Sequence, residues 1–306
     1  MSGPVGEPDR RCENEPVPGI EVREGRAASV GGLDIVRVLP TKGRRTVGPW
    51  CFVDLMLPPD AEDPDPMEVG PHPHIGLSTV TWLLEGEAIH SDSLGTEQPI
   101  RPGQLNLMTA GHGIAHAELG TTAGLHGVQM WVAQPEHTRH GPNRFEHHAE
   151  LPQVELGSGR ATVFMGSLEG VVSPATTETP LVGAELSLRR GVVEMPLDTA
   201  FEHCVVPIDR PMLAGDVVVA PGWIGLVPPG VESMRIDPGD SGGRIMILGG
   251  VPLGERIQMW WNFVARTRDE LDRAYRDWQA HDSDRFGPVP SSLERIDAPT
   301  PPWATD

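Results

Sequence analysis

The chain has 306 residues, of which 43 are acidic and 24 are Lys or Arg, and its formal net charge at pH 7 is −19. A chain this acidic repels phosphate backbones, so the composition argues against direct nucleic-acid binding. The sequence has neither an apolar N-terminal segment typical of a signal peptide nor a run of about 18 apolar residues, so we expect a cytoplasmic protein without a membrane span.

Short strands and turns should dominate the fold. The sequence holds 36 Gly and 32 Pro and is only 38% hydrophobic, a composition that favours β-structure over long helices. Its length suits two domains. We therefore expect an all-β protein of two tandem barrels with one C-terminal helix.

The first part of the chain is expected to be an arm followed by strands. Residues 1–20 are polar and rich in Pro, and predict a flexible N-terminal arm. Residues 33–39 alternate between apolar and polar side chains, whereas residues 50–56 are almost continuously apolar and predict a strand buried on both faces. Residues 58–66 carry four prolines and predict a loop.

Four side chains able to bind a metal follow in two pairs. His72 and His74 form one pair, and His116 and Glu118 form the other. Side chains two residues apart in a strand point to the same face, so the four groups converge if both strands belong to one barrel. Imidazole and carboxylate ligands without sulfur suit a divalent ion of borderline character, and the three scattered cysteines, Cys12, Cys51 and Cys204, offer no paired thiolate site.

Other residues near this stretch have weaker claims. Residues 126–132 predict a strand whose Gln129 and Trp131 either line the metal cavity or belong to ordinary barrel packing. His112 is a candidate pocket group, and His90 is expected to be an exposed strand residue. Residues 135–150 contain several histidines without regular spacing, and predict a solvated interdomain linker.

The second half repeats the first in outline but without its ligands. Gly215 takes the place of Gly103, and the position that corresponds to His116 is Pro228, which offers no ligand atom. His203 has no partner two residues away. We therefore expect a C-terminal barrel without a metal site, which covers one face of the first barrel or shapes the cleft between them.

One helix is expected near the C-terminus. Thr267 and Glu270 form a capping box, and apolar residues follow at helical spacing from Leu271 to Trp278. The predicted organisation is an arm (1–20), a metal-binding barrel (21–145), a barrel without metal (146–265), and a helix with a Pro-rich tail (266–306).

The central motifs also resemble those of a known family. HPH followed by Gly, then TVT-x-LLEGE, DSLG, RPG and MTAG-x-GI-x-H-x-E, is similar to the pattern of pirins, which are bicupins. The resemblance runs from about Val22 to Pro288 and implies that His72, His74, His116 and Glu118 bind the metal. The chain departs from many pirins at Ile75 and His112, where Arg is common. Both residues are expected at the pocket rim.

The resemblance implies two functions of different kinds. One is an oxidoreductase of the quercetinase type, a dioxygenase that acts on a flavonol or related enol such as quercetin, with iron(II) as the expected ion and Mn, Ni, Cu, Zn or Co as alternatives. In that case Glu118 is the expected general base. The other is a metal-binding regulatory protein that acts on a partner enzyme or transcription factor without catalysis. A cupin isomerase is less favoured because no motif specifies sugar or phosphate recognition. An apolar pocket beside the metal would favour the enzyme, and a flat charged face would favour the regulator.

Overall fold

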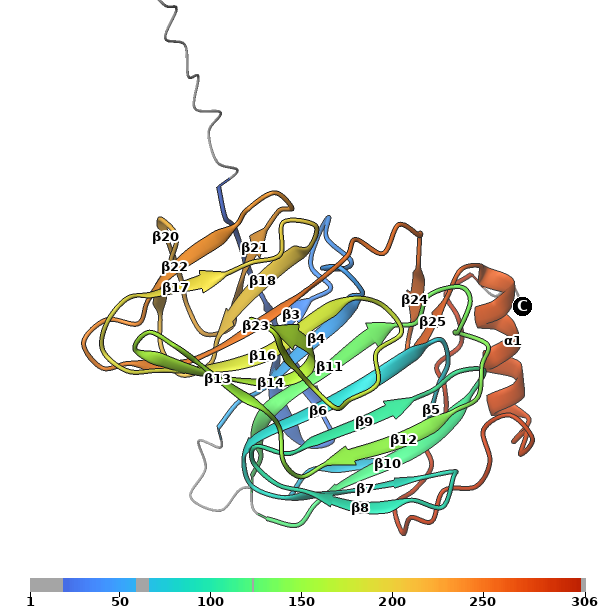
Figure 1. Ribbon diagram of the computed structural model, residues 1–306. Coiled ribbons are helices and arrows are strands. Elements are labelled where there is room, and N and C mark those ends of the chain that lie inside the picture. The colour runs from blue at the N-terminus through green and yellow to red at the C-terminus, as the bar shows by residue number, and fades with distance from the viewer. Residues whose placement is uncertain (1–18, 59–65, 123, 304–306) are drawn as a thin grey trace, which may run out of the picture.

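The computed structural model describes residues 19–58, 66–122 and 124–303. It consists of two β-barrels, which lie side by side, and one helix that packs on the first barrel (Figure 1). The all-β prediction with a single C-terminal helix is confirmed. The predicted arm, apart from its last two residues, and the inner part of the predicted loop at residues 58–66 lie outside the described residues.

The first barrel is made of a seven-stranded sheet that faces a four-stranded sheet. The larger sheet has the order β12-β9-β6-β11-β4-β3-β2, and the smaller one has the order β5-β10-β7-β8. Their bounds are β2 Arg26–Val30, β3 Leu33–Leu39, β4 Trp50–Met56, β5 Glu68–His74, β6 Leu77–Glu85, β7 Ala88–Asp92, β8 Glu97–Ile100, β9 Leu105–Thr109, β10 Ile114–Gly120, β11 His126–Ala133 and β12 Arg144–His148.

The second barrel has the same two-sheet construction. Its larger sheet follows β1-β21-β18-β23-β16-β14-β13, with β15 paired to β14, and its smaller sheet follows β17-β22-β19-β20. The bounds are β1 Glu21–Glu24, β13 Gln153–Leu156, β14 Gly159–Leu168, β15 Val171–Val172, β16 Leu181–Leu188, β17 Val193–Pro196, β18 Glu202–Pro207, β19 Met212–Ala214, β20 Val217–Val219, β21 Trp223–Val227, β22 Ser233–Asp237 and β23 Gly243–Gly250.

The central strands of the seven-stranded sheet are buried on both faces because the second barrel covers their outer side. Every residue of β4 is buried, as the apolar run predicted. Val53, Val80 and Val128 point outward and share one apolar core with residues of the second barrel such as Phe164 and Leu248. Residues one position along each strand point the other way, into the first barrel. The second barrel therefore fixes the sheet from behind while its front face stays available for a site.

Three segments lie in a different part of the fold than the sequence suggested. Glu21–Glu24, expected in the first barrel, pairs with β21 of the second. Arg144–His148 is not a solvated linker but strand β12, which completes the first barrel's large sheet beside β9. The hairpin of β24 (Gln258–Trp260) and β25 (Phe263–Ala265) contacts β5 of the first barrel through a bridge between Ile75 and Phe263. In each case cross-strand pairing, which local periodicity does not specify, decides the assignment.

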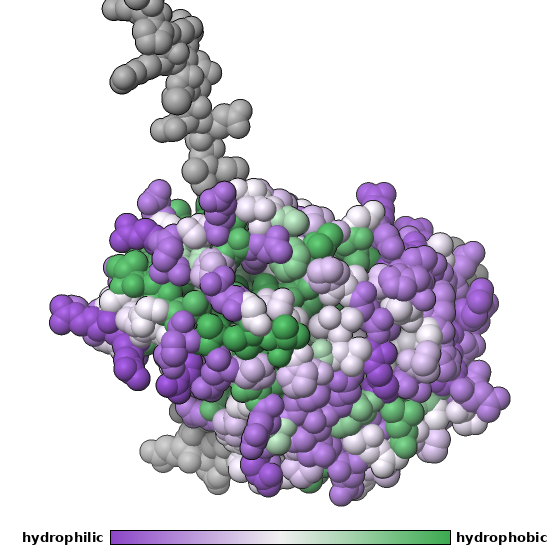
Figure 2. All heavy atoms as spheres, viewed as in Figure 1, coloured by the Kyte–Doolittle hydropathy of each residue, from purple (hydrophilic) through white to green (hydrophobic). Residues whose placement is uncertain are grey.

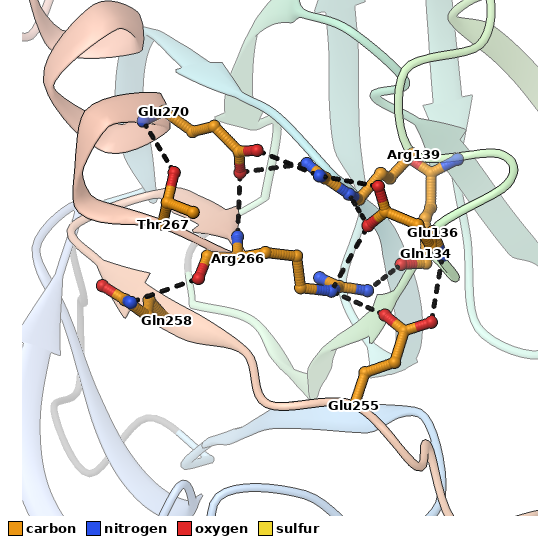
Figure 3. A network of polar contacts seen from close by, with 8 residues as sticks. All are labelled: Gln134, Glu136, Arg139, Glu255, Gln258, Arg266, Thr267 and Glu270. Atoms are coloured by element: carbon orange, nitrogen blue, oxygen red, sulfur yellow. Dashed lines mark hydrogen bonds and ion pairs between the residues drawn. The ribbon is translucent and has the colours of Figure 1, made fainter.

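The helix α1 (Arg268–Gln279) begins as predicted, and Thr267 is its N-cap. The Thr267 hydroxyl accepts a hydrogen bond from the Glu270 backbone N–H at 3.3 Å. The Glu270 carboxylate does not return the bond to Thr267; it accepts from the Arg266 backbone N–H and from both terminal nitrogens of Arg139 (Figure 3). This bidentate pair with the buried Arg139 fastens the helix start to the loop after β11.

Leu271, Ala274 and Trp278 form the buried face of the helix. They pack with Ile75 and Phe263 in one apolar cluster beneath β5. The predicted apolar stripe is therefore confirmed, and it supports the strand that carries the two neighbouring histidines.

The surface divides in a similar way. Figure 2 shows apolar residues gathered over the second barrel, whereas the side that carries α1 is mostly polar. Exposed apolar side chains of the second barrel include Val172, Val192, Leu213 and Val218. No helix among the described residues is long and apolar enough to cross a membrane.

Replacement of Thr267 by Ala removes the side-chain acceptor at the helix start. We expect Thr267→Ala to lower the free energy of unfolding by about 1 kcal/mol, the usual contribution of an N-cap hydroxyl. Urea denaturation followed by fluorescence measures the change. Thr199→Ala, at an exposed turn position, is the matched control, and equal effects of the two substitutions would contradict the capping role.

Candidate metal centre

The two predicted ligand pairs lie on neighbouring strands. His72 and His74 belong to β5, His116 and Glu118 belong to β10, and His116 is paired directly with His72. Ligand nitrogens of the three histidines all lie within 4.8 Å of one another. The Nε2 atoms of His74 and His116 are only 3.1 Å apart. The sequence argument therefore placed the three imidazoles together correctly.

An irregularity in β5 helps to aim these side chains. The register between β10 and β5 shifts between His116 and Glu118, so that Glu118 is paired with Val69 and not with Gly70. Gly70 lies within the bulge, and a Cβ atom there would come 1.9 Å from the Glu294 carbonyl oxygen of the C-terminal segment. Only Gly permits this close backbone approach. The bulge leaves the Gly70 carbonyl directed at His72 Nδ1, 2.9 Å away.

Each of the three rings has its Nδ1 held by a partner, which leaves Nε2 for the metal. A carbonyl oxygen only accepts, so His72 Nδ1 donates to Gly70 and His74 Nδ1 donates to Asn262 at 3.0 Å. Asn262 lies in the turn of the β24–β25 hairpin. The Nε2 atoms of His72 and His74 therefore keep a free lone pair, which is the form a metal ion requires.

His116 is oriented by two residues that the sequence analysis misjudged or passed over. His90 was expected to be exposed, but it is 3% exposed, and its Nδ1 lies 3.3 Å from His116 Nδ1. His90 Nε2 donates to the fully buried Asp92 carboxylate at 3.1 Å. A neutral His90 then accepts at Nδ1, so His116 Nδ1 donates and its Nε2 is free. His90 and Asp92 form a third pair two residues apart, a signal that was present in the sequence.

Burial keeps the three imidazoles neutral. Desolvation lowers the pKa of His72 to about 4. Desolvation, together with the neighbouring His72, holds the pKa values of His74 and His116 well below the usual range. Neutral rings in a dry site are prepared to bind a cation without first losing a proton. The donor set thus fits a divalent ion of borderline character.

Glu118 is half-buried, and its carboxylate groups with His116 but not with His72 and His74. One carboxylate oxygen lies 3.5 Å from the Thr81 hydroxyl. Glu118 groups with His90 and His116 and not with all three predicted ligands. Burial raises the pKa of the Glu118 carboxyl above its usual value, against the opposing effects of His90 and Thr81. Its assignment as a fourth ligand stays a prediction, and its environment favours a carboxylate that binds a proton readily.

A cavity of about 410 Å³ opens beside these residues, within the range common for small-molecule sites. Gln129 and Trp131 line it, so the inward-facing alternative is correct for both. Its remaining wall is largely apolar and includes Val30, Leu33, Ile35, Phe52, Met56, Met67, Val69 and Trp261.

Ile75 and His112 do not lie at the rim of this cavity. Both line a smaller hollow beside Arg139 and Glu270, and Ile75 packs against Phe263. Because neighbouring strand residues point to opposite faces, Ile75 points away from the cavity that His74 faces. The two departures from the common pirin pattern therefore lie outside the metal cavity.

The second barrel holds His203, whose ring is buried beside Phe201. Desolvation lowers its pKa to about 4. Over the part of the chain that the structure describes, both groupings of three potential ligands lie in the first barrel.

The fold and the first barrel's histidine cluster define the class of two-barrel cupins. Comparison with known proteins agrees: the Pirin family model matches residues 32–132, and the model of the pirin C-terminal cupin domain matches residues 225–286. The chain belongs to the pirin family.

Individual relatives extend over nearly the whole chain. A protein of Pseudomonas aeruginosa, named as a candidate quercetin 2,3-dioxygenase, is 40% identical over 287 residues, covering 92% of this chain and 90% of its own. A pirin-like protein of Caulobacter vibrioides is 35% identical over 85% of this chain and 92% of its own. The crystal structure of a quercetin 2,3-dioxygenase from Acinetobacter baumannii superposes with a TM-score of 0.89 at 38% identity, covering 94% of this chain and 97% of that one.

The geometry predicts one metal ion per chain in the first barrel. His74→Ala and His116→Ala each remove one nitrogen from the cluster, so we expect the metal content to fall from near one ion per chain to a small fraction of that. Elemental analysis of anaerobically purified protein measures it. His203→Ala is the control and should retain the wild-type content. Full metal content in both first-barrel variants would refute the assignment.

A second prediction concerns the orientation of His116. His90→Leu removes the acceptor for His116 Nδ1 but no predicted ligand, and we expect metal affinity to fall roughly 10- to 100-fold, as is usual when such a supporting partner is lost. Competition with a chelator measures the affinity. His112→Leu, which changes a histidine outside the cavity, should leave it unchanged. If the two variants bind metal equally well, His90 has no orienting role.

Proposed function

We propose that this protein is a metal-dependent dioxygenase that opens the ring of a flavonol or a related cyclic enol, with quercetin as the model substrate. One observation carries the proposal: the three free imidazole nitrogens face a mainly apolar cavity with an aromatic wall. The relatives named for quercetin 2,3-dioxygenase activity support the same reaction.

The ligand residues His72, His74, His116 and Glu118 would hold the ion, with iron(II) as the proposed metal and Mn, Ni, Cu, Zn or Co as alternatives. When bound, the ion supplies a positive charge that favours the deprotonated form of an enol beside it, and iron also supplies the redox chemistry that dioxygen requires. Ferrous iron with three neutral imidazoles and one carboxylate carries a net charge of about +1 by simple addition of ligand charges.

The protein's own residues bind the substrate and take its proton. Phe52 and Trp131 stack with ring centroids 3.9 Å apart and form an apolar, aromatic part of the cavity wall. Glu118 is the proposed general base, since it lines the cavity and its raised pKa favours proton uptake. The enol hydroxyl proton passes to a Glu118 carboxylate oxygen.

The overall reaction balances without any further reductant. For a flavonol, both atoms of dioxygen enter the product, two carbon–carbon bonds of the central ring break, and the carbon between them leaves as carbon monoxide. The largely apolar wall of the cavity serves this chemistry because it shields the reacting carbanion-like substrate from water on the sides that it contacts.

The alternative is a metal-binding regulatory protein that acts through a partner enzyme or transcription factor. A regulatory protein of this kind was expected to have a flat, charged face beside the metal. The observed surroundings, with Met56, Met67 and Val69 lining a cavity, favour a small molecule as the occupant.

Glu118→Gln tests the base. The substitution keeps the size of the side chain but removes its basicity, so we expect the variant to retain much of its iron while kcat for quercetin falls roughly 100- to 10,000-fold. Oxygen uptake and carbon monoxide release measure turnover, with iron determined in the same samples. Thr121→Val, a change of one exposed hydroxyl, should leave turnover intact.

Two outcomes oppose the proposal in different ways. Undiminished turnover in Glu118→Gln would remove Glu118 as the base while leaving the reaction in place. If iron-loaded wild-type protein consumes no oxygen with any flavonol or related enol, the dioxygenase proposal fails and the regulatory protein becomes the better account.

A further inference from the structure

Polar side chains form a continuous row across the inner face of the first barrel's large sheet. The strand register pairs each member directly with the next, and paired residues point to the same face of a sheet. One residue comes from each of six neighbouring strands, in the order Arg37, Asp54, Gln129, Thr81, Asn106 and His147.

This row runs between two apolar rows of the same face. Phe52 and Trp131, two residues along their strands from Asp54 and Gln129, are paired and stacked on one side. Ile35 and Met56 are paired on the other side. The residues of these three rows line the metal cavity, except for Thr81, Asn106 and His147. A flat molecule beside this aromatic wall would therefore lie alongside the polar row.

Most members of the row satisfy one another. Arg37 Nε and Nη2 donate to the two oxygens of Asp54 at 2.7 and 2.6 Å. Asn106 Oδ1 lies 2.7 Å from His147 Nδ1, and the Thr81 hydroxyl faces Glu118. These bonds fix the row on both sides of Gln129.

Gln129, the third residue of the row, has an unpaired hydrogen-bond acceptor. Its Oε1 atom is buried, and no donor among the described residues lies within hydrogen-bond distance. Its neighbours do not supply one, because Arg37 is engaged by Asp54 and Thr81 is directed at Glu118. Because Oε1 is buried, a ligand hydroxyl reaches it once the Gln129 amide turns toward the cavity. The bond then formed relieves the free-energy cost of a buried polar atom without a partner.

We propose that Gln129 determines substrate specificity by accepting a hydrogen bond from a hydroxyl group on the substrate, separate from the enol that reacts. This inference deepens the proposed dioxygenase function and rests on it. The substrate class is then a planar molecule of two or three linked rings that carries its enol toward Glu118 and at least one further hydroxyl along the polar row. The three strand spacings from Thr81 to Arg37 span roughly 14 Å, which accommodates such a molecule.

The proposal separates hydroxylated ligands from otherwise similar ones. Quercetin has both the enol and additional ring hydroxyls, whereas 3-hydroxyflavone has the enol alone. Because 3-hydroxyflavone would leave Gln129 Oε1 unpaired, we expect wild-type protein to bind quercetin about tenfold more tightly, the factor that one net hydrogen bond supplies.

Anaerobic titration of metal-loaded protein with each ligand, followed by quenching of tryptophan fluorescence, tests this. Gln129→Met keeps the length of the side chain but removes its acceptor, so quercetin affinity should fall about tenfold while 3-hydroxyflavone affinity stays within twofold. Gln153→Met, the same change on an exposed strand of the second barrel, should preserve the wild-type preference. Metal content and the thermal midpoint establish that each variant is folded. Gln129→Asn, which withdraws the amide by one methylene, should show the same loss of preference if the Met variant does not load metal.

Three results would overturn the assignment: a preference for quercetin that persists in both Gln129 variants, an equal loss of affinity for both ligands, or no binding of either ligand to wild type. Oxygen uptake, measured separately, tests the reaction itself. If the protein prefers quercetin to 3-hydroxyflavone but consumes no oxygen, the dioxygenase proposal is rejected and Gln129 remains the selective contact. If it consumes oxygen but binds both ligands equally, the dioxygenase proposal remains and the role of Gln129 is rejected.

Discussion

The burial of three imidazole rings around one point is the constraint on which the rest of the structure depends. Neutral rings whose lone pairs converge gain nothing from one another, so other parts of the protein must hold them in place. The bulge in β5 directs the Gly70 carbonyl to His72, and the hairpin turn at Asn262 reaches His74 from a distant part of the chain. His90 and Asp92 hold His116. The donors of the site are thus organised by partners from three separate segments.

The second barrel and the C-terminal segment act as supports for this arrangement. The large sheet of the first barrel packs its outer face on the second barrel, so its inner face is free to carry functional side chains. Helix α1, fastened through Arg139 and Glu270, backs β5 from the opposite side (Figure 3). The second barrel contributes to the site from behind, because it replaces solvent on one face of a sheet that would otherwise need a polar exterior.

Much of the site could be predicted from the sequence because strand periodicity is a local property. Spacing alone selected His72, His74, His116 and Glu118, and the structure brings the three histidines together. The continuous apolar run likewise predicted the buried strand at residues 50–56. His90 was misjudged because it was weighed singly and without Asp92 two residues later. The wrong assignments of Glu21–Glu24 and Arg144–His148 have another cause: each strand is short, and its partner is set by tertiary pairing. Ile75 was misplaced by its nearness to His74 in sequence, although alternation turns it to the opposite face.

A crystal structure of the iron-loaded protein with quercetin, grown without oxygen, tests the central claim most directly. The account predicts one iron ion in the first barrel, bound through Nε2 of His72, His74 and His116 and within reach of Glu118. It also places the 3-hydroxyl oxygen of quercetin on the iron and the flavonol rings against Phe52 and Trp131. Iron bound by other residues, or quercetin bound outside the cavity while the iron site is filled, would contradict it.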